Sequence, residues 1–268
     1  METTCKVIRI GLDELHRHSP EPRDLGPEFA PEATCYCLYT SGTTGLPKGC
    51  EITHANCVQA MMAFQDLFKG HWQSDSRWLQ FAALHFDVSV LEQYWSWSVG
   101  ITVVAASRDL ILDDLIGSIN RLSITHIDLT PSLARLTHPD DVPGLCKGVF
   151  ITGGEALKQE ILDDWGPKEV IYNAYGPTEA TIGVTMYQRV PVNGRPSNIG
   201  KQFLNVGSYV FQRATEIPVL RGGVGELCVS GKLVGKGYLN RPELTEERFP
   251  MLREFDDRIY RTGDLRRT

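Results

Sequence analysis

The sequence of 268 residues has no apolar run that approaches the roughly 20 residues of a transmembrane helix. Its first stretch, METTCKVIRIGL, also lacks the apolar segment of a signal peptide. Positive charge is scarce: 27 lysines and arginines stand against 33 aspartates and glutamates, and no basic patch is segregated from the rest. A surface with a net charge of -6 repels phosphate polymers. We therefore expect a cytoplasmic protein that binds neither nucleic acid nor a membrane.

Cysteine gives no sign of a disulfide framework. The seven cysteines are an odd number scattered along the chain, which is typical of reduced thiols. Internal repeats and low-complexity tracts are also missing. With 42% hydrophobic residues, the chain can bury a sizeable core in one large or two modest domains.

The composition and hydrophobic pattern of the sequence change twice along the chain, and these changes predict three parts. Residues 1–32 end in a proline-rich, charged stretch without a helical or strand period, which predicts a linker or irregular segment. Over 33–190, short apolar runs such as 35–40 and 148–153 alternate with helical stretches, the pattern of a parallel sheet flanked by helices. Over 191–268, glycine-punctuated short strands predict a small β-rich subdomain. The predicted fold class is α/β, followed by this subdomain.

A helix is predicted over residues 54–68. Cys57, Met61, Phe64 and Phe68 recur on one side of it at helical spacing. We interpret this apolar stripe as core packing rather than as a cofactor site.

The stretch TSGTTGLPKG, from Thr40 to Gly49, gathers hydroxyls, glycines and one lysine behind a predicted strand. Glycines let the backbone turn tightly and expose N–H groups, while the hydroxyls and Lys48 add donors and positive charge. This composition suits a phosphate-binding loop, although the spacing of a Walker A loop does not occur. A flexible turn is the alternative for this segment taken alone.

Two later stretches could also serve a nucleotide. YNAYGPTE, from Tyr172 to Glu179, offers an aromatic ring able to stack on a base, then a hydroxyl and a carboxylate able to reach a magnesium ion. YRTGDL, from Tyr260 to Leu265, offers Asp264 as an acceptor for paired ribose hydroxyls. Taken singly, the first could be a strand, a turn and a helix cap, and the second a surface turn.

Taken together and in this order, these stretches resemble the core motifs of the adenylate-forming enzymes, the superfamily of acyl-CoA synthetases, luciferases and nonribosomal peptide synthetase adenylation domains. GGEAL at Gly153 and GELCVSGKLVGKGYL at Gly225 also match, so the resemblance runs from about Cys35 to the end. It implies part of the large N-terminal domain of such an enzyme, with ATP and magnesium as cofactors.

The resemblance also implies roles for the matched residues. A substrate carboxylate would attack the α-phosphate of ATP in line, with most of the rate coming from positioning and charge neutralisation. Thr178, Glu179 and Lys48 would be catalytic, and Glu179 would bind the metal. The nucleotide set would be Thr40, Ser41, Gly42, Thr43, Thr44, Gly45 and Lys48 at the phosphates, Gly153, Gly154, Glu155 and Tyr175 around adenine, Asp264 at the ribose, and Asn173 and Gly176 elsewhere in the site.

FDVS, from Phe86 to Ser89, narrows the family. In adenylation domains that activate α-amino acids, the aspartate at this place binds the substrate ammonium, and the matching residue is Asp87. A carboxylate that faces an apolar cleft is costly unless a cation meets it. A helix N-cap is the alternative, and both roles can coexist. The resemblance carries over the rest of the substrate pocket as Val88, Leu91, Asp128, Ile151, Gly153, Ala174, Ile182 and Gly183.

The small residues of this set leave room for a long side chain, and Asp128 supplies a distal acceptor. The stretches HFDVSVLEQYWSWSVG, THIDLTPSLARL and GVFITGGEALKQEIL resemble fungal ferrichrome-type siderophore synthetases. This resemblance implies Nδ-acyl-Nδ-hydroxyornithine as the substrate, with its N–OH donating to Asp128. Ornithine fits the same argument, and glycine or serine is also activated within that family.

The family pattern extends beyond this chain in both directions. It includes a further N-terminal portion, a small C-terminal domain with a lysine that stabilises the transition state, and a carrier domain bearing phosphopantetheine. We expect these remaining adenylation and carrier domains to be partners, and the isolated chain to be an impaired fragment. The alternatives are an acyl-CoA or aryl-acid ligase and a non-catalytic truncated remnant.

Overall fold

The computed structural model describes residues 26, 30–41, 46–254 and 256–267. Its largest element is a seven-stranded sheet with the order β4-β3-β5-β6-β7-β8-β9. The strands are β3 (Arg77–Gln80), β4 (Thr102–Ala105), β5 (His126–Leu129), β6 (Val149–Thr152), β7 (Ile171–Tyr175), β8 (Thr185–Tyr187) and β9 (Lys201–Gln202). The first five are parallel, whereas β8 and β9 are antiparallel to their neighbours. The predicted parallel sheet is confirmed.

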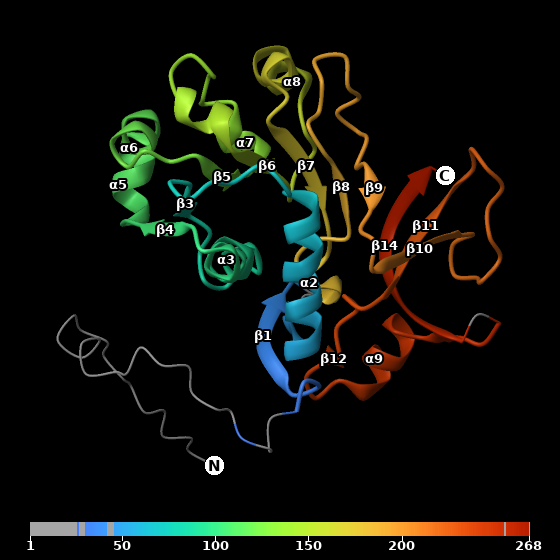
Figure 1. Ribbon diagram of the computed structural model, residues 1–268. Coiled ribbons are helices and arrows are strands. Elements are labelled where there is room, and N and C mark those ends of the chain that lie inside the picture. Colours follow the sequence, from blue (N-terminus) through green and yellow to red (C-terminus); the bar gives the residue numbers. More distant parts are fainter. Residues whose placement is uncertain (1–25, 27–29, 42–45, 255, 268) are drawn as a thin grey trace.

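Helices cover both faces of this sheet (Figure 1). One face carries α5 (Arg108–Asp113), α6 (Leu115–Arg121), α7 (Pro131–Ala134) and α8 (Gln159–Trp165), with short 3-10 turns η2 (Pro143–Lys147) and η3 (Gly166–Lys168). The other carries α2 (His54–Leu67) and a helical run of α3 (Val88–Val90), η1 (Leu91–Trp95) and α4 (Ser96–Val99). None of the described helices is long and apolar enough to cross a membrane.

The side chains of β6 show how the two layers are held. Val149 and Ile151 point into the core with Phe64 of α2, while Phe150 points into the core with Trp165 of α8. Successive residues of a strand face opposite sides, so a strand buried on both faces must be apolar throughout. This explains why β6 reads as the unbroken apolar run VFI.

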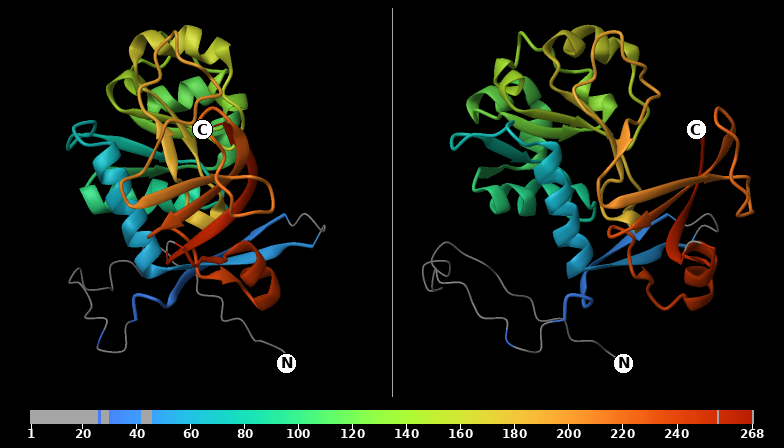
Figure 2. Two further views of the ribbon diagram at one scale, coloured as in Figure 1. Left: turned by 90° about the vertical axis from the view of Figure 1, so that its right-hand side faces the viewer. Right: turned by 45° about the vertical axis from the view of Figure 1, so that its right-hand side comes forward.

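Two smaller sheets complete the fold. One is three-stranded, of β1 (Thr34–Thr40), β2 (Lys48–Thr53) and β12 (Gly237–Tyr238). The other is four-stranded, of β10 (Val206–Phe211), β11 (Val224–Gly231), β14 (Asp257–Arg267) and β13 (Met251–Leu252). Helix α9 (Pro242–Arg248) and β12 lie next to the β1–β2 hairpin (Figure 2). The predicted β-rich region is present, and the strands of its four-stranded sheet pair antiparallel.

One strand lies elsewhere than the sequence pattern predicts. The run 35–40 forms β1, but the expectation that it joins the parallel sheet is wrong, because β1 pairs antiparallel with β2. The chain between Thr40 and Lys48 is too short for a parallel crossover, which needs about a dozen residues or more. The division at residue 190 stays a prediction: β9 extends the large sheet and β12 pairs with β2.

Candidate active site

A cavity of about 380 Å³ opens where the parallel strands end. All nine predicted substrate residues line it: Asp87, Val88, Leu91, Asp128, Ile151, Gly153, Ala174, Ile182 and Gly183. Phe81, Ala82 and Arg108 line it as well, although no sequence motif indicated them. The predicted residues come from α3, η1, the central strands and the turn after η4 (Thr178–Ala180), so the fold brings them to one space.

Asp87 lies just before α3 with 8% of its surface exposed. Its Oδ2 atom is buried and has no hydrogen-bond partner among the described residues. Burial raises the pKa of Asp87 to about 6, against the opposing effect of a hydrogen bond from Thr178. Asp87 occupies the N-cap position of α3, as the alternative predicted, but within the described structure its side chain makes no capping bond to the helix. The orphaned oxygen leaves Asp87 ready to accept a bond from a ligand.

Asp128 lies near the end of β5, lines the same cavity and is half-buried. Burial raises the pKa of Asp128 well above its usual range, and the nearby carboxylates of Glu92 and Asp87 add to the effect. A carboxylic acid that keeps its proton offers both a donor and an acceptor. Two of the carboxyl groups that line this cavity, those of Asp87 and Asp128, therefore have raised pKa values.

Glu92, which does not itself line the cavity, is a further carboxyl behind its wall and was not predicted. It belongs to η1, a π-helical turn, and its side chain is fully buried. It accepts hydrogen bonds from the backbone N–H groups of Phe81 at 3.2 Å and Ala82 at 3.1 Å. Burial raises the pKa of Glu92 to about 7, although these bonds oppose the rise. These bonds fix the two residues that follow β3, Phe81 and Ala82, which line one wall of the cavity.

A second cavity of about 480 Å³ adjoins the first and shares Gly154, Glu155, Ala174 and Gly176 with it. Six of the predicted nucleotide residues line it: Gly154, Glu155, Asn173, Tyr175, Gly176 and Asp264. At Gly176 the neighbouring backbone is so close that a Cβ would lie 2.4 Å from the Gly183 Cα, so no larger residue fits. The shared lining residues show that the two cavities adjoin, an arrangement that suits a ligand with two parts.

The predicted nucleotide-binding residues differ in which cavity they line and in what they contact. Gly153 lines the first cavity rather than the second. Glu155 lines both and accepts a hydrogen bond from the backbone N–H of Ser132 at 3.2 Å. Asn173 donates to the backbone oxygen of Asn198 at 2.9 Å, which holds the loop forming the outer wall.

Tyr175 and Asp264 meet across the second cavity. The Tyr175 hydroxyl donates to Oδ2 of Asp264 at 2.5 Å, although the two residues lie 89 positions apart. The Arg266 guanidinium lies 4.6 Å from the centre of the Tyr175 ring, and no motif pointed to it. Burial, followed by the Asp264 carboxylate, raises the pKa of the Tyr175 phenol. An aromatic face, a carboxylate and a cation therefore line the same space.

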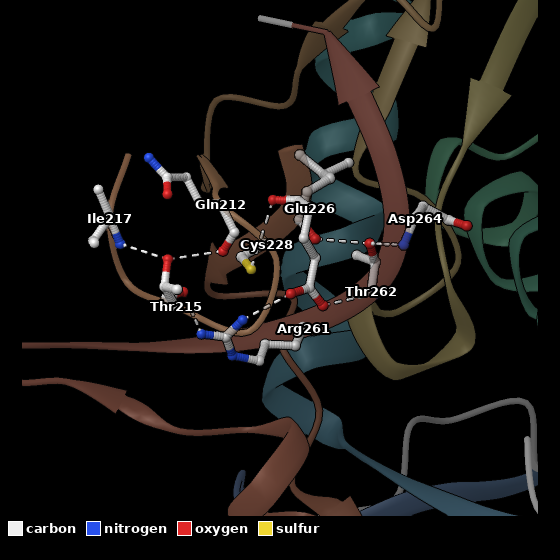
Figure 3. Close-up of polar contacts among 10 residues, drawn as sticks. Gln212, Thr215, Ile217, Glu226, Cys228, Arg261, Thr262 and Asp264 are labelled. Atoms are coloured by element: carbon white, nitrogen blue, oxygen red, sulfur yellow. Dashed lines mark hydrogen bonds and ion pairs between the residues drawn. The ribbon is translucent and has the colours of Figure 1, made fainter. Parts of the chain in front are cut away.

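A polar network on β11 and β14 positions Asp264 (Figure 3). The buried carboxylate of Glu226 accepts from Arg261 at 2.7 Å and from the backbone N–H of Gly263 at 3.2 Å. The Thr262 hydroxyl accepts from the Asp264 N–H at 3.0 Å. Gly263 has φ of +79°, a conformation that glycine adopts at little cost. The network thus fixes the turn that carries the predicted ribose ligand.

The three predicted catalytic residues lie outside both cavities as the described residues define them. Lys48, at the start of β2, forms an ion pair with Oε1 of Glu179 at 2.9 Å. The Tyr238 hydroxyl donates to the same Oε1 at 2.7 Å and lies 2.6 Å from the Lys48 ammonium. Burial opposes ionisation of Glu179, but the bonds from Lys48 and Tyr238 outweigh it and lower the pKa of Glu179. Glu179 is therefore a buried, ionised carboxylate.

The donors at this place suit magnesium. The Glu179 carboxylate offers oxygen ligands of the kind that magnesium prefers, and the Lys48 ammonium already lies where a cation is favoured. Among the described residues, no group of three or more histidine, cysteine, aspartate or glutamate side chains could hold a metal. Magnesium is commonly held by one or two carboxylates together with substrate phosphates, so a single glutamate fits that mode.

The predicted phosphate loop is described only at its ends. Gly42, Thr43, Thr44 and Gly45 lie outside the described residues. Thr40 ends β1, and its hydroxyl is buried without a hydrogen-bond partner in the described part of the chain. Ser41 is exposed beside it.

The parallel strands of the α/β sheet thus end at two adjoining pockets, one lined by carboxyl groups and the other by an aromatic ring, a carboxylate and a guanidinium. The chain belongs to the AMP-binding enzyme family, whose model matches residues 5–239. This is the family that its motifs indicated.

Fungal synthetases are among its relatives. The chain is 75% identical over 264 residues to nonribosomal peptide synthetase 2 of Gibberella zeae and 76% identical over 264 residues to nonribosomal peptide synthetase SIDC of Beauveria bassiana, covering 98% of this chain in each case. It is 56% identical over 240 residues, 90% of this chain, to the hydroxamate-type ferrichrome siderophore peptide synthetase of Schizosaccharomyces pombe. The chain spans only 6%, 6% and 5% of these relatives.

Solved structures agree with this relationship. The Vibrio cholerae adenylation domain AlmE, in complex with glycyl-adenosine-5'-phosphate, matches with a TM-score of 0.77 and 27% identity over 88% of this chain and 46% of that one. A four-domain nonribosomal peptide synthetase bound to AMP and glycine matches with a TM-score of 0.76 and 27% identity, over 87% of this chain and 17% of that one. The predicted fold and family are confirmed.

Proposed function

We propose that this chain is the central part of an adenylation domain that uses ATP to activate an amino acid within a siderophore-producing nonribosomal peptide synthetase. The observation that carries the proposal is the buried Asp87 oxygen without a partner among the described residues, in a cavity that continues into the Tyr175 pocket. An α-ammonium group would satisfy this oxygen, and a nucleotide would fill the second pocket.

In this arrangement the substrate carboxylate lies at the junction of the cavities, near Gly176. One carboxylate oxygen attacks the α-phosphorus, the bond from that phosphorus to the bridging oxygen breaks, and pyrophosphate leaves with the electron pair. The residues contribute mainly by holding both reactants in line. Asp87 fixes the ammonium end, and Tyr175 with Asp264 fixes the nucleoside.

Lys48 and Glu179 serve the phosphates in this proposal. Magnesium, when bound at Glu179, would offset the charge of the phosphate oxygens. Lys48 would leave its ion pair with Glu179 and contact the β- and γ-phosphates beside the 40–48 loop. The aminoacyl group would pass to phosphopantetheine on a carrier domain outside this chain, in the cytoplasm.

The proposed substrate is Nδ-acyl-Nδ-hydroxyornithine or a close ornithine derivative. A protonated Asp128 offers one donor and one acceptor, which match the carbonyl and N–OH of a hydroxamate. The δ-ammonium of ornithine would instead require an ionised Asp128. The hydroxamate-type relative at 56% identity supports the first choice.

The test is binding of an aminoacyl-sulfamoyl-adenosine built on Nδ-acetyl-Nδ-hydroxyornithine, together with ATP–pyrophosphate exchange on the free amino acids. We expect Asp87→Ala to weaken binding by roughly 10- to 100-fold, the value of a hydrogen bond to a charged group. The matched ligand without the α-amino group should bind wild type and variant alike.

Each other result has a defined meaning. Tight wild-type binding of the ligand without the amino group would favour the acyl-CoA or aryl-acid ligase. Failure of every adenosine ligand to bind the folded chain would favour a non-catalytic remnant. Preference for glycine or serine ligands would overturn the hydroxamate substrate and leave amino-acid activation standing.

A further inference from the structure

The cluster of Lys48, Tyr238 and Glu179 contains a residue that has no role in the mechanism above. Tyr238 forms part of β12, which reaches this place because Tyr238 pairs with Cys50 of β2. Its hydroxyl lies 2.7 Å from Oε1 of Glu179 and 2.6 Å from the Lys48 ammonium. Two side chains from distant parts of the sequence therefore converge on one oxygen of the Glu179 carboxylate.

The direction of these bonds follows from the chemistry of the groups. An ammonium has only donors and an ionised carboxylate has only acceptors. The single proton of the Tyr238 hydroxyl therefore goes to Glu179, and its oxygen accepts from Lys48. Both Tyr238 and Lys48 donate to Oε1, which leaves Oε2 out of these bonds.

Tyr238 is itself held firmly. Only 4% of its surface is exposed, and its ring lies edge-to-face on Phe249 with a centroid distance of 5.3 Å. Its backbone N–H donates to the Thr245 hydroxyl at 2.9 Å. A fixed phenol that donates to a carboxylate fixes the orientation of that carboxylate.

We infer that Tyr238 is a positioning residue that keeps Glu179 oriented for the magnesium of the bound nucleotide when Lys48 moves to the phosphates. The Lys48 ammonium then marks the position that favours a cation, and the Tyr238 bond persists when magnesium replaces the ammonium. This inference rests on the proposed function. Carboxylates that ligate metals usually need such a partner, whose loss costs about 10- to 100-fold in metal affinity.

The test is Tyr238→Phe in the full chain, which removes only the hydroxyl. ATP binding is measured by calorimetry over a range of magnesium concentrations, and the sulfamoyl-adenosine ligand is measured with EDTA. We expect the magnesium concentration for half-maximal ATP binding to rise about tenfold. Affinity for the sulfamoyl ligand, which has no β- or γ-phosphate, should change less than about twofold because the nucleoside pocket is untouched.

Tyr209→Phe is the matched control, because the Tyr209 hydroxyl donates to the Asp257 carboxylate at 2.9 Å on another sheet. It should leave the magnesium dependence unchanged. In a Glu179→Gln background, Tyr238→Phe should add less than about a twofold effect, since the tyrosine acts through that carboxylate. An equal effect in both backgrounds would overturn the inference.

Two further results separate the inference from the proposed function. Unchanged magnesium dependence of Tyr238→Phe, with normal ATP binding by the wild type, overturns the inference alone. Absence of ATP binding by the wild type overturns both. Should Tyr238→Phe fail to fold, 3-fluorotyrosine can replace Tyr238, because it retains the hydroxyl. Its ¹⁹F signal should shift when magnesium is added to the ATP complex. An unmoved signal overturns the inference.

Discussion

At the scale of single residues, four carboxyl groups in and around the two cavities have different environments. Asp87 has a buried oxygen without a partner among the described residues, and Asp128 lies near other carboxyls. Glu92 accepts from backbone N–H groups, and Glu179 is paired with a lysine. Burial acts on all of them, so the partners decide which carboxyl is ionised. The proposed substrate, structural and metal roles of these groups rest on this difference.

The pH dependence of stability tests the role of Glu92. Its folded pKa of about 7 lies above the ordinary value of 4.5, so the folded state holds more protons between these values and loses stability as pH rises through them. Glu92→Gln keeps an acceptor for the Phe81 and Ala82 N–H groups without the charge. Between pH 5 and pH 8 we expect the melting temperature of this variant to fall less than that of the wild type. The corresponding difference in unfolding free energy is on the order of 3 kcal/mol.

The matched control is Glu160→Gln on the exposed side of α8, which should melt in parallel with the wild type. Parallel curves for Glu92→Gln and the wild type would show that the Glu92 carboxyl does not carry the pH effect.

At the scale of elements, the apolar pattern predicted those helices and strands that depend on residues close together in the sequence. Helix α2 follows the predicted 54–68 within one residue, and its buried positions include Cys57, Met61 and Phe64. The π-turn η1 could not be predicted, because nothing in the apolar period of 87–97 marks an extra residue per turn. The place of β1 was missed because β2, whose sequence KGCEIT lacks a strong apolar run, was not recognised as a strand.

The turn between Arg261 and Asp264 gives a prediction at this scale. Gly263→Ala should cost about 1 kcal/mol of stability, because φ of +79° is unfavourable for alanine. It should also weaken AMP binding several-fold, because the turn carries Asp264. Gly70→Ala is a matched control, since Gly70 has the same φ of +79° and no described atom lies within 4 Å of the place that an alanine Cβ would take.

Both variants should lose similar stability in thermal melts, and only Gly263→Ala should lose affinity in calorimetry with AMP. Equal AMP affinity in the two variants would show that the position of Asp264 does not depend on this turn.

At the scale of the whole molecule, the order of motifs predicted much of the candidate site. The ends of β5, β6 and β7 meet at one edge of a parallel sheet, so Asp128, Gly153 and Ala174 had to lie close together. The contacts of Tyr238 and Arg266 could not be predicted, because they depend on how β12 pairs with β2 and how β14 ends beside β7. Such placements depend on how the sheets pack together, and no periodic pattern in the sequence indicates that packing.

The joined cavities give the last prediction. A ligand that fills both should bind far more tightly than the amino acid or AMP alone, because the second half binds as part of the same molecule. Asp87→Ala should weaken the amino acid and the linked sulfamoyl ligand while leaving AMP unchanged, and Asp264→Ala should weaken AMP and the linked ligand while leaving the amino acid unchanged. Calorimetry with the three ligands on the two variants decides this. Weakened AMP binding by Asp87→Ala would mean that the two cavities do not act as separate subsites of one bipartite site.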